Sequence, residues 1–211
     1  MKIVRVMPDF SHERKLIGQG VRFVAGVDEV GRGPLAGPVA VAAVILDPLA
    51  IPEGLDDSKM VPEPRREALS KAILESALGV SIALASAAEI DTYNIRGATL
   101  RAMRRALAAL TPRPDFALID GRDIPEGLIC PAEALIGGDG RSQSIAAASI
   151  VAKVLRDQLM READRHCPGY GFAAHKGYGT AAHRAPIERL GLSRLHRRSF
   201  KTVALAYFEE G

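Results

Sequence analysis

The chain has 211 residues, of which 47% are hydrophobic and 25% charged, and this ordinary globular composition excludes a disordered, collagen-like or coiled-coil chain. Its 28 Lys and Arg residues against 25 Asp and Glu residues leave a net charge of only +3, which does not by itself indicate a nucleic-acid partner. The longest apolar runs, such as residues 39–46, fall far short of the roughly 20 residues that cross a bilayer. A membrane-spanning protein is therefore excluded, and no membrane partner is expected.

The N-terminus and the cysteines indicate the compartment. The first residues lack a long apolar core followed by a small-residue cleavage site, so a secretory signal is not expected. Cys130 and Cys167 form no CxxC pair, which fits a reducing compartment. We expect a cytoplasmic protein with a single catalytic domain over residues 1–211, including an N-terminal extension (1–20) and a small C-terminal helical segment (about 186–211).

Hydrophobic periodicity predicts alternating strands and helices in the first half of the chain. Residues 21–30 and 39–46 are expected to be strands, joined by a Gly/Pro-rich turn over residues 31–37. Apolar residues at helical spacing follow two prolines and predict a helix over residues 65–78. A short strand is expected over residues 80–85.

The second half continues the same alternation. An amphipathic helix is predicted over residues 98–110, and the all-apolar run 116–119 is typical of a central strand buried on both faces. A Gly/Asp loop at residues 137–140 precedes a helix over residues 142–160, whose alanine-rich face allows close packing on a sheet. A last short helix is expected near residues 202–209. These elements predict a single α/β or α+β domain.

Acidic residues in apolar strands are the most informative feature. Asp28 and Glu29 interrupt an apolar strand and Asp120 ends another, where an unpaired charge is costly to bury. An ion pair with Arg32 or Lys59 would offset that cost, and so would a divalent metal ion bound by carboxylate oxygens.

Asp139, in the second glycine-rich loop, gives a possible fourth carboxylate ligand. Two Mg²⁺ or Mn²⁺ ions about 4 Å apart can activate a water molecule and stabilise a leaving oxygen in phosphodiester hydrolysis. Capping and surface roles for the four carboxylates remain the alternative.

Basic residues cluster in two places, although the net charge is small. Such clusters can contact phosphates or can be the solvated faces of surface helices. The two groups are Arg101, Arg104 and Arg105, and then Arg194, His196, Arg197, Arg198 and Lys201.

Other functional patterns fit poorly. The glycines at 31, 33 and 37 differ from the GxGxxG spacing of dinucleotide-binding loops and precede a second strand rather than a helix. No GxSxG sequence supports a serine hydrolase. Four residues could be considered as zinc ligands, but their spacing lacks the regularity of structural zinc sites. These four are His166, Cys167, His175 and His183.

At residues 24–38 the sequence VAGVDEVGRGPLAGP closely resembles the opening motif of the type 2 ribonucleases H, known in bacteria as ribonuclease HII. Further segments follow in the order found in that family, so the resemblance covers about residues 20–200. These segments are Asp57-Ser58-Lys59, Tyr93-Asn94-Ile95, residues 118–121, Gly138-Asp139, residues 146–154 and residues 175–178. The N-terminal stretch to about residue 20 matches nothing in this pattern.

The resemblance implies an RNase H-like fold, a mixed five-stranded sheet flanked by helices, with four carboxylates at its centre. The matching metal-binding and catalytic positions are Asp28, Glu29, Asp120 and Asp139. Asp157, in a similar stretch, is interpreted as structural.

The resemblance also assigns substrate-binding residues. The loop Gly31-Arg32-Gly33 would sense the 2′-hydroxyl of a ribonucleotide through its backbone, and Tyr178 would stack on the next sugar. Residues expected to position phosphates or support the carboxylates are Lys59, Ser149, Lys153, His175 and Lys176. With no longer C-terminal helical extension present, duplex affinity is expected to depend on the basic residues 194–201.

We therefore expect an endoribonuclease, a monomer, that cleaves the RNA strand of RNA/DNA hybrids and cuts 5′ of single ribonucleotides in duplex DNA. Two Mn²⁺ or Mg²⁺ ions would be bound with substrate, and the products would carry 3′-hydroxyl and 5′-phosphate ends. The alternatives are a non-catalytic nucleic-acid-binding module of the same fold and a DNA-cutting relative such as a resolvase or transposase.

Overall fold

A single mixed sheet organises the chain in the computed structural model, which describes residues 7–201 and 203. Its five strands lie in the order β3-β2-β1-β4-β5. Neighbours β1 and β2, and β2 and β3, are antiparallel, whereas β1 and β4, and β4 and β5, are parallel. The strands are β1 (Val24–Val30), β2 (Val39–Ile45), β3 (Gly79–Ala85), β4 (Phe116–Asp120) and β5 (Ala132–Leu135).

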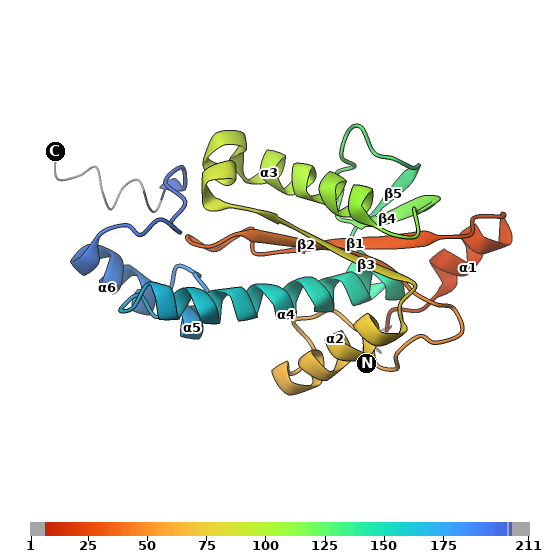
Figure 1. The fold of residues 1–211 in the computed structure, drawn as a ribbon, viewed down its shortest axis with the longest axis horizontal. Coiled ribbons are helices and arrows are strands. Elements are labelled where there is room, and N and C mark those ends of the chain that lie inside the picture. Colours follow the sequence, from red (N-terminus) through yellow and green to blue (C-terminus); the bar gives the residue numbers. More distant parts are fainter. Residues whose placement is uncertain (1–6, 202, 204–211) are drawn as a thin grey trace, which may run out of the picture.

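Helices cover both faces of this sheet (Figure 1), with α3 on one face and α2 and α4 on the other. The helices α5 and α6 gather beside the C-terminal end of α4, and α1 lies near the start of β1. The helices are α1 (Ser11–Gly18), α2 (Glu63–Ser76), α3 (Ala87–Ala109), the 3-10 turn η1 (Gly138–Gly140), α4 (Gln143–His166), α5 (Phe172–His175) and α6 (Ala181–Leu190).

The long helix α4 packs closely on the central strands because small residues line its inner face. Ala146, Ala147 and Ala148 are fully buried between α4 and the sheet. A Cβ atom at Gly26 of β1 would collide with the backbone of Ser144, so no larger side chain fits between strand and helix. This contact fixes the start of α4 against the strand that carries two of the acidic residues.

The strands and helices predicted in the core of the chain are confirmed, with differences in extent. The helix expected over residues 98–110 begins earlier, at Ala87, and is interrupted at Asn94, whose φ of 55° and ψ of 169° are not helical. The Asn94 side chain accepts a hydrogen bond from the backbone N–H of Gly97 at 3.0 Å. Asn94 therefore caps the second part of α3, and it divides the helix where periodicity alone shows no boundary.

Three elements were not predicted, α1, β5 and α5, and α6 begins before the helical segment expected from about residue 186. Strand β5 has the sequence AEAL, which lacks the β-branched and aromatic residues typical of strands, and it forms by pairing with β4. Within the N-terminal extension, α1 packs onto the domain through Glu13, whose side chain is fully buried and accepts a hydrogen bond from Ser142 at 2.6 Å.

The C-terminal expectations are only partly covered by the structure. The helix expected at residues 202–209 falls outside the described residues except for position 203. Within the segment expected from about residue 186, only the last turns of α6 are helical before residue 201. In the part of the chain that the structure describes, no helix has the length and apolar character needed to cross a membrane.

Candidate active site

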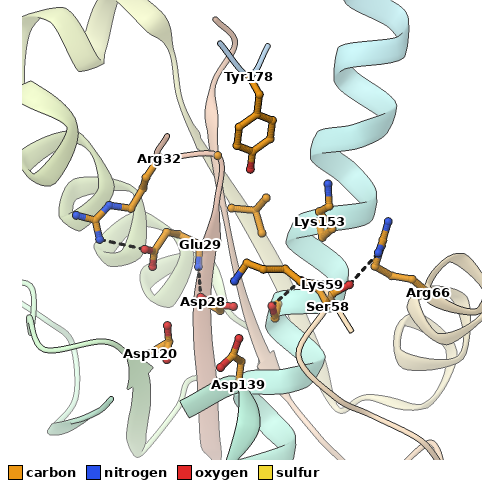
Figure 2. A pocket seen from close by; sticks show the side chains of 13 residues that line it. Asp28, Glu29, Arg32, Ser58, Lys59, Arg66, Asp120, Asp139, Lys153 and Tyr178 are labelled. Carbon is orange, nitrogen blue, oxygen red and sulfur yellow. Dashed lines mark hydrogen bonds and ion pairs between the residues drawn. The ribbon is translucent and has the colours of Figure 1, made fainter. Parts of the chain in front are cut away.

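The four carboxylates identified in the sequence line one cavity of about 450 Å³ (Figure 2). Asp28 and Glu29 lie near the end of β1, and Asp120 is the last residue of β4. Because β1 and β4 are parallel neighbours, their carboxyl ends meet at the same edge of the sheet. Asp139 lies in the turn η1, immediately before α4. The topology thus brings together residues that are far apart in the sequence.

Burial and repulsion from neighbouring carboxylates disfavour the charged forms of three of these carboxylates, Asp28, Glu29 and Asp139. Asp28 is 5% exposed, and its burial raises its pKa well above the usual value, with repulsion from Glu29 and Asp120 adding to the effect. Burial also raises the pKa of Glu29, although Arg32 opposes the rise. The pKa of Asp139 is raised by burial and then by repulsion from other carboxylates, including Asp120. A cation bound among these groups would relieve both costs.

Backbone hydrogen bonds hold two of the four carboxylates in place. The Asp28 carboxylate accepts a hydrogen bond from the backbone N–H of Glu29 at 2.7 Å. Asp120 Oδ1 accepts one from the backbone N–H of Gly138 at 2.6 Å. The second bond ties the end of β4 to the turn that carries Asp139, so it sets the spacing between two of the acidic residues.

The ion-pair alternative applies to one of the four carboxylates. Arg32 Nη1 lies 3.2 Å from Glu29 Oε1, whereas Lys59 pairs at 3.9 Å with Asp57, outside the set of four. Burial works against the charge on Lys59, yet the surrounding carboxylates, led by Asp57, raise its pKa overall. Both cations therefore face the acidic cavity, and only Arg32 pairs directly with one of the four.

The donor set fits a hard divalent cation. All four candidate ligands are carboxylates, and no histidine or cysteine of the described residues lines the cavity. Oxygen donors of this kind suit Mg²⁺ and Mn²⁺, whereas structural zinc sites use sulfur and nitrogen ligands. Among the described residues, no three acidic, histidine or cysteine side chains are already arranged to hold an ion, and Glu29 is engaged by Arg32. A metal ion would therefore compete with Arg32 for Glu29 Oε1.

The glycine-rich loop after β1 forms another wall of the cavity and is held by two buried arginines. Arg197 donates hydrogen bonds to the carbonyl oxygens of Gly31, Arg32 and Gly37, the shortest at 2.6 Å. Arg156 Nε donates to Pro38 at 2.9 Å. Gly31 has a φ of +98°, and a Cβ atom there would collide with the Arg156 side chain. Arg197 and Arg156 do not line the cavity, so they hold the backbone of this loop from the side away from it.

Tyr178 lies at the opposite end of the cavity from the carboxylates, with its ring pointing inward (Figure 2). Its side chain is 43% exposed, and the Arg156 guanidinium carbon lies 6.0 Å from the ring centroid. Gly33 is close by, since a Cβ atom built there would lie 3.9 Å from the Tyr178 ring. An exposed ring beside an accessible backbone leaves room for a planar contact with a substrate.

Ten of the thirteen site residues expected from the sequence line the cavity, and three do not: Gly33, His175 and Lys176. His175 instead accepts a hydrogen bond from the backbone N–H of Gly177 at 3.1 Å through Nδ1, which shapes the turn before Tyr178. The Lys176 amino group bonds to the carbonyl oxygen of Ala173. These placements favour support of the turn over direct contact with phosphates for His175 and Lys176.

Three lining residues are absent from the sequence-based site: Val30, Ser58 and Arg66. Ser149 Oγ donates to Ser58 Oγ at 3.0 Å, and Arg66 Nη1 donates to the Ser58 carbonyl oxygen at 2.8 Å. The signal for Ser58 was present, because it lies between two residues of a recognised segment. Arg66 carries no such signal, because the sequence predicts only that it lies in the helix over residues 65–78.

Asp157 has a supporting place beside the cavity. Its carboxylate accepts a hydrogen bond from Lys153 Nζ at 2.7 Å and lies 3.6 Å from Arg66 Nη2. Lys153 and Arg66 both line the cavity, whereas Asp157 does not. Asp157 therefore orients two positively charged side chains of the cavity wall from outside the cavity. The structural interpretation of this residue agrees with these contacts.

The two basic clusters differ from what the sequence indicates. Arg105 is paired with Glu89 at 2.6 Å, and Arg101 and Arg104 line a separate cavity. The expectation that residues 194–201 form a phosphate-binding surface is wrong at two positions, because His196 and Arg197 are 2% and 0% exposed. The guanidinium of Arg197 is fully used by the glycine-rich loop, which removes it from the surface.

Comparison with known proteins gives consistent matches. Residues 25–203 match the family described as ribonuclease HII. The chain is 58% identical over 203 residues to a ribonuclease HII from Ruegeria pomeroyi, covering 96% of this chain and 86% of that protein. A ribonuclease H2 from Pyrococcus horikoshii is similar in structure, with a TM-score of 0.76 at 24% identity, covering 88% of this chain and 97% of that one. Bst-RNase HIII, solved in complex with Mn²⁺, gives a TM-score of 0.61 at 21% identity, covering 87% and 68% of the two chains.

Proposed function

The chain belongs to the ribonuclease HII family, and on this premise we propose that the cavity lined by Asp28, Glu29, Asp120 and Asp139 is its catalytic centre. Enzymes of this family are endonucleases that cleave the RNA of RNA/DNA hybrids and ribonucleotides in DNA. The observation that carries the assignment is the convergence of four carboxylates from β1, β4 and η1 on one cavity.

The four carboxylates would hold two divalent ions, Mn²⁺ or Mg²⁺, when substrate is bound. Bound there, such ions would supply an activated water and stabilise the leaving oxygen of a phosphodiester. Support comes from the all-oxygen donor set and from the raised pKa of Asp28, Glu29 and Asp139. A ribonuclease HIII of the same fold has been solved in complex with Mn²⁺.

The protein's own groups would orient the substrate around this centre. Asp28 and Asp120, each fixed by a backbone hydrogen bond, would keep the hydrolytic site rigid. Lys153, oriented by Asp157, lies in the cavity wall and would meet a phosphate oxygen. Because water rather than the 2′-hydroxyl is the nucleophile, the products would carry 3′-hydroxyl and 5′-phosphate ends.

Recognition of ribose would fall to the glycine-rich loop and Tyr178. The backbone of Gly31, Arg32 and Gly33 is clamped from behind by Arg197, which leaves its outer side free for close approach to a 2′-hydroxyl. The inward-pointing ring of Tyr178 would stack on the sugar 3′ of the ribonucleotide. This arrangement supports cutting on the 5′ side of a single ribonucleotide, with indifference to base sequence.

We also infer the setting in which the enzyme acts. Its substrates would be RNA/DNA hybrids and duplex DNA with embedded ribonucleotides, and it would act as a monomer. The two cysteines are free, which fits a reducing compartment such as the cytoplasm.

A labelled DNA duplex with one ribonucleotide tests the proposal directly. We expect cutting only 5′ of the ribonucleotide in Mg²⁺ or Mn²⁺, and none in EDTA or with an all-DNA duplex. Equal cutting of the all-DNA duplex would indicate a DNA nuclease, and binding without cutting in either metal would indicate a non-catalytic module; either result would contradict the proposal.

A further inference from the structure

A second depression adjoins the catalytic cavity on the side of α3. A narrow hollow of about 30 Å³ shares Glu29, Arg32 and Asp120 with the catalytic cavity. The same hollow shares Arg96 and Leu100 with a larger cavity of about 300 Å³ farther along α3. The three spaces therefore lie next to one another along α3, and we refer to them together as the groove, which leads away from the carboxylates.

The far end of this groove is basic. Three arginines of α3 line it, Arg96, Arg101 and Arg104, against a single acidic residue, Glu126. Arg96 is already engaged, since its guanidinium donates to Asp123 at 2.7 and 3.0 Å. Neither Arg101 nor Arg104 forms an ion pair with any residue that the structure describes, and both side chains are exposed. Two positive charges are thus free for a ligand.

The rest of the lining suits a chain that alternates charged and apolar parts. Leu100, Ile124 and Pro125 form apolar surface between the arginines, and Ile124 is 46% exposed. The Arg101 guanidinium carbon lies 4.0 Å from the ring centroid of Tyr93, a cation–π contact that helps to position this side chain. Guanidinium forks match phosphate oxygens, and apolar surface suits the sugars between them.

The length of the groove agrees with a nucleic-acid strand. Arg96 and Arg104 are separated by about 12 Å along the helix axis, taking about 1.5 Å per residue. One strand of a duplex carries about three phosphates over this distance. We propose that the groove lined by Arg96, Arg101 and Arg104 holds the sugar–phosphate backbone of the substrate duplex on one side of the cleavage point. This inference rests on the proposed function, because it assigns part of the same substrate to a second surface.

Arg105 provides a matched control on the same helix. It follows Arg104 directly, but its side chain points to Glu89 and to the Leu84 carbonyl oxygen, away from the groove. Arg104→Ala and Arg105→Ala each remove one positive charge from α3. Only the first should remove a phosphate contact.

Salt dependence of binding measures the number of phosphate contacts. We would titrate a fluorescent duplex with one central ribonucleotide by anisotropy, in EDTA, between 50 and 200 mM KCl. The plot of log affinity against log salt should become shallower by about 0.9 for Arg104→Ala and about 1.8 for Arg101→Ala/Arg104→Ala. Between 50 and 200 mM KCl, the fold-decrease in the affinity of wild type should therefore be about 12 times that of the double variant. Arg105→Ala should keep the wild-type slope.

Two further measurements keep the test decisive. Arg104→Lys retains the charge and should keep the wild-type slope. Arg104→Gln removes the charge and should make the slope shallower by about 0.9, which covers the case in which Arg104→Ala does not fold. In Mn²⁺ the double variant should show a raised KM with a smaller change in kcat. If the double variant cleaves like wild type with an unchanged slope and KM, the groove does not hold the backbone of the duplex. The proposed function would remain intact. A wild type that neither binds nor cuts the duplex would overturn the proposed function itself.

Discussion

The guanidinium group of Arg197 donates a hydrogen bond of 2.6 Å to the carbonyl oxygen of Gly31, which lies 166 residues earlier in the chain. The same side chain bonds the carbonyl oxygens of Arg32 and Gly37, and it is fully buried. Burial lowers the pKa of Arg197, so folding opposes its charge, and the three carbonyl groups compensate for that cost. The glycine-rich loop thus depends on a residue near the C-terminal end of the described part of the chain.

Substitution of Arg197 should therefore affect both stability and ribonucleotide recognition. Arg197→Lys keeps a positive charge but loses the planar fork, so carbonyl groups of the loop lose their donors. We expect a loss of about 2 kcal/mol in the free energy of unfolding, together with about a tenfold lower kcat/KM on a single-ribonucleotide duplex, equivalent to about 1.4 kcal/mol. Denaturant unfolding and steady-state cleavage measure the two effects. Arg198→Lys, at the exposed neighbour, is the control, and equal behaviour of the two variants would contradict the role of Arg197.

The two glycines of the loop should respond differently to alanine. Gly31→Ala places a Cβ against the Arg156 side chain at a φ of +98°, so we expect the protein to lose about 2–4 kcal/mol of stability. Gly33→Ala meets only the Tyr178 ring, at an ordinary 3.9 Å, and should leave the melting temperature within about 2 °C of wild type. Thermal unfolding separates the two variants.

Gly33→Ala is also expected to reduce kcat/KM for ribonucleotide cleavage, because the methyl group would stand where the sugar approaches. A Gly33→Ala protein with wild-type cleavage would show that the substrate does not come close to this position. A Gly31→Ala protein as stable as wild type would show that the loop can move away from Arg156.

Asp28 is expected to destabilise the metal-free protein and yet to be required for cleavage. Its buried carboxylate is repelled by Glu29 and Asp120, so Asp28→Asn should stabilise the metal-free protein by about 1–2 kcal/mol while abolishing cleavage. Melting temperatures in EDTA test the first expectation. Added Mn²⁺ should raise the wild-type melting temperature by about 5–10 °C at a concentration near 100 times its dissociation constant, and the variant much less. Equal Mn²⁺ shifts in both proteins would remove Asp28 from the metal site.

A buried histidine cluster should make stability depend on pH. His183 stacks on His175 with ring centroids 4.2 Å apart, and its Nε2 lies 3.1 Å from that of His196. Burial, followed by repulsion from His175, lowers the pKa of His183 to about 4. Its ordinary value is 6.5, so between these two values the unfolded chain binds the proton more strongly. Stability is therefore complete above pH 6.5 and falls as the pH drops towards 4.

The pH effect can be assigned to His183 with one variant. Wild type should lose about 1 kcal/mol more than His183→Gln between pH 7.5 and 5, after solvent screening is allowed for. Urea unfolding at the two pH values gives both numbers. Parallel losses in the two proteins would place the pH dependence elsewhere.

The carboxylate site was predictable because its residues break a local rule. Acidic residues at the ends of apolar strands carry a burial cost that a metal site or an ion pair must offset, and Asp28 and Asp120 are both in this position. The clamp by Arg197 was not predictable, because an arginine within a basic run looks like surface charge. Its burial depends on carbonyl groups of a loop from the other end of the chain, which no local pattern contains.

The same contrast holds for the fold. Strands β1 to β4 and the core of α4 follow from periodicity, since their burial is set by their own residues. Strand β5 and the interruption of α3 at Asn94 depend on pairing and capping partners instead. Arg104 and Arg105 are neighbours in one basic cluster, yet Arg104 lines a cavity and Arg105 pairs with Glu89. This difference likewise depends on which side of α3 each residue occupies.

During translation, Arg197 is added to the chain after all four carboxylates of the cavity. A ribosome that adds about 5–20 residues per second needs about 3 to 12 seconds to proceed from Asp139, the last carboxylate, to Arg197. During this interval the nascent chain contains every acidic residue of the site but not the side chain that fixes the glycine-rich loop. A nascent chain would then lack the clamp on the glycine-rich loop until Arg197 has been added, so chains that end before this residue would be poor nucleases.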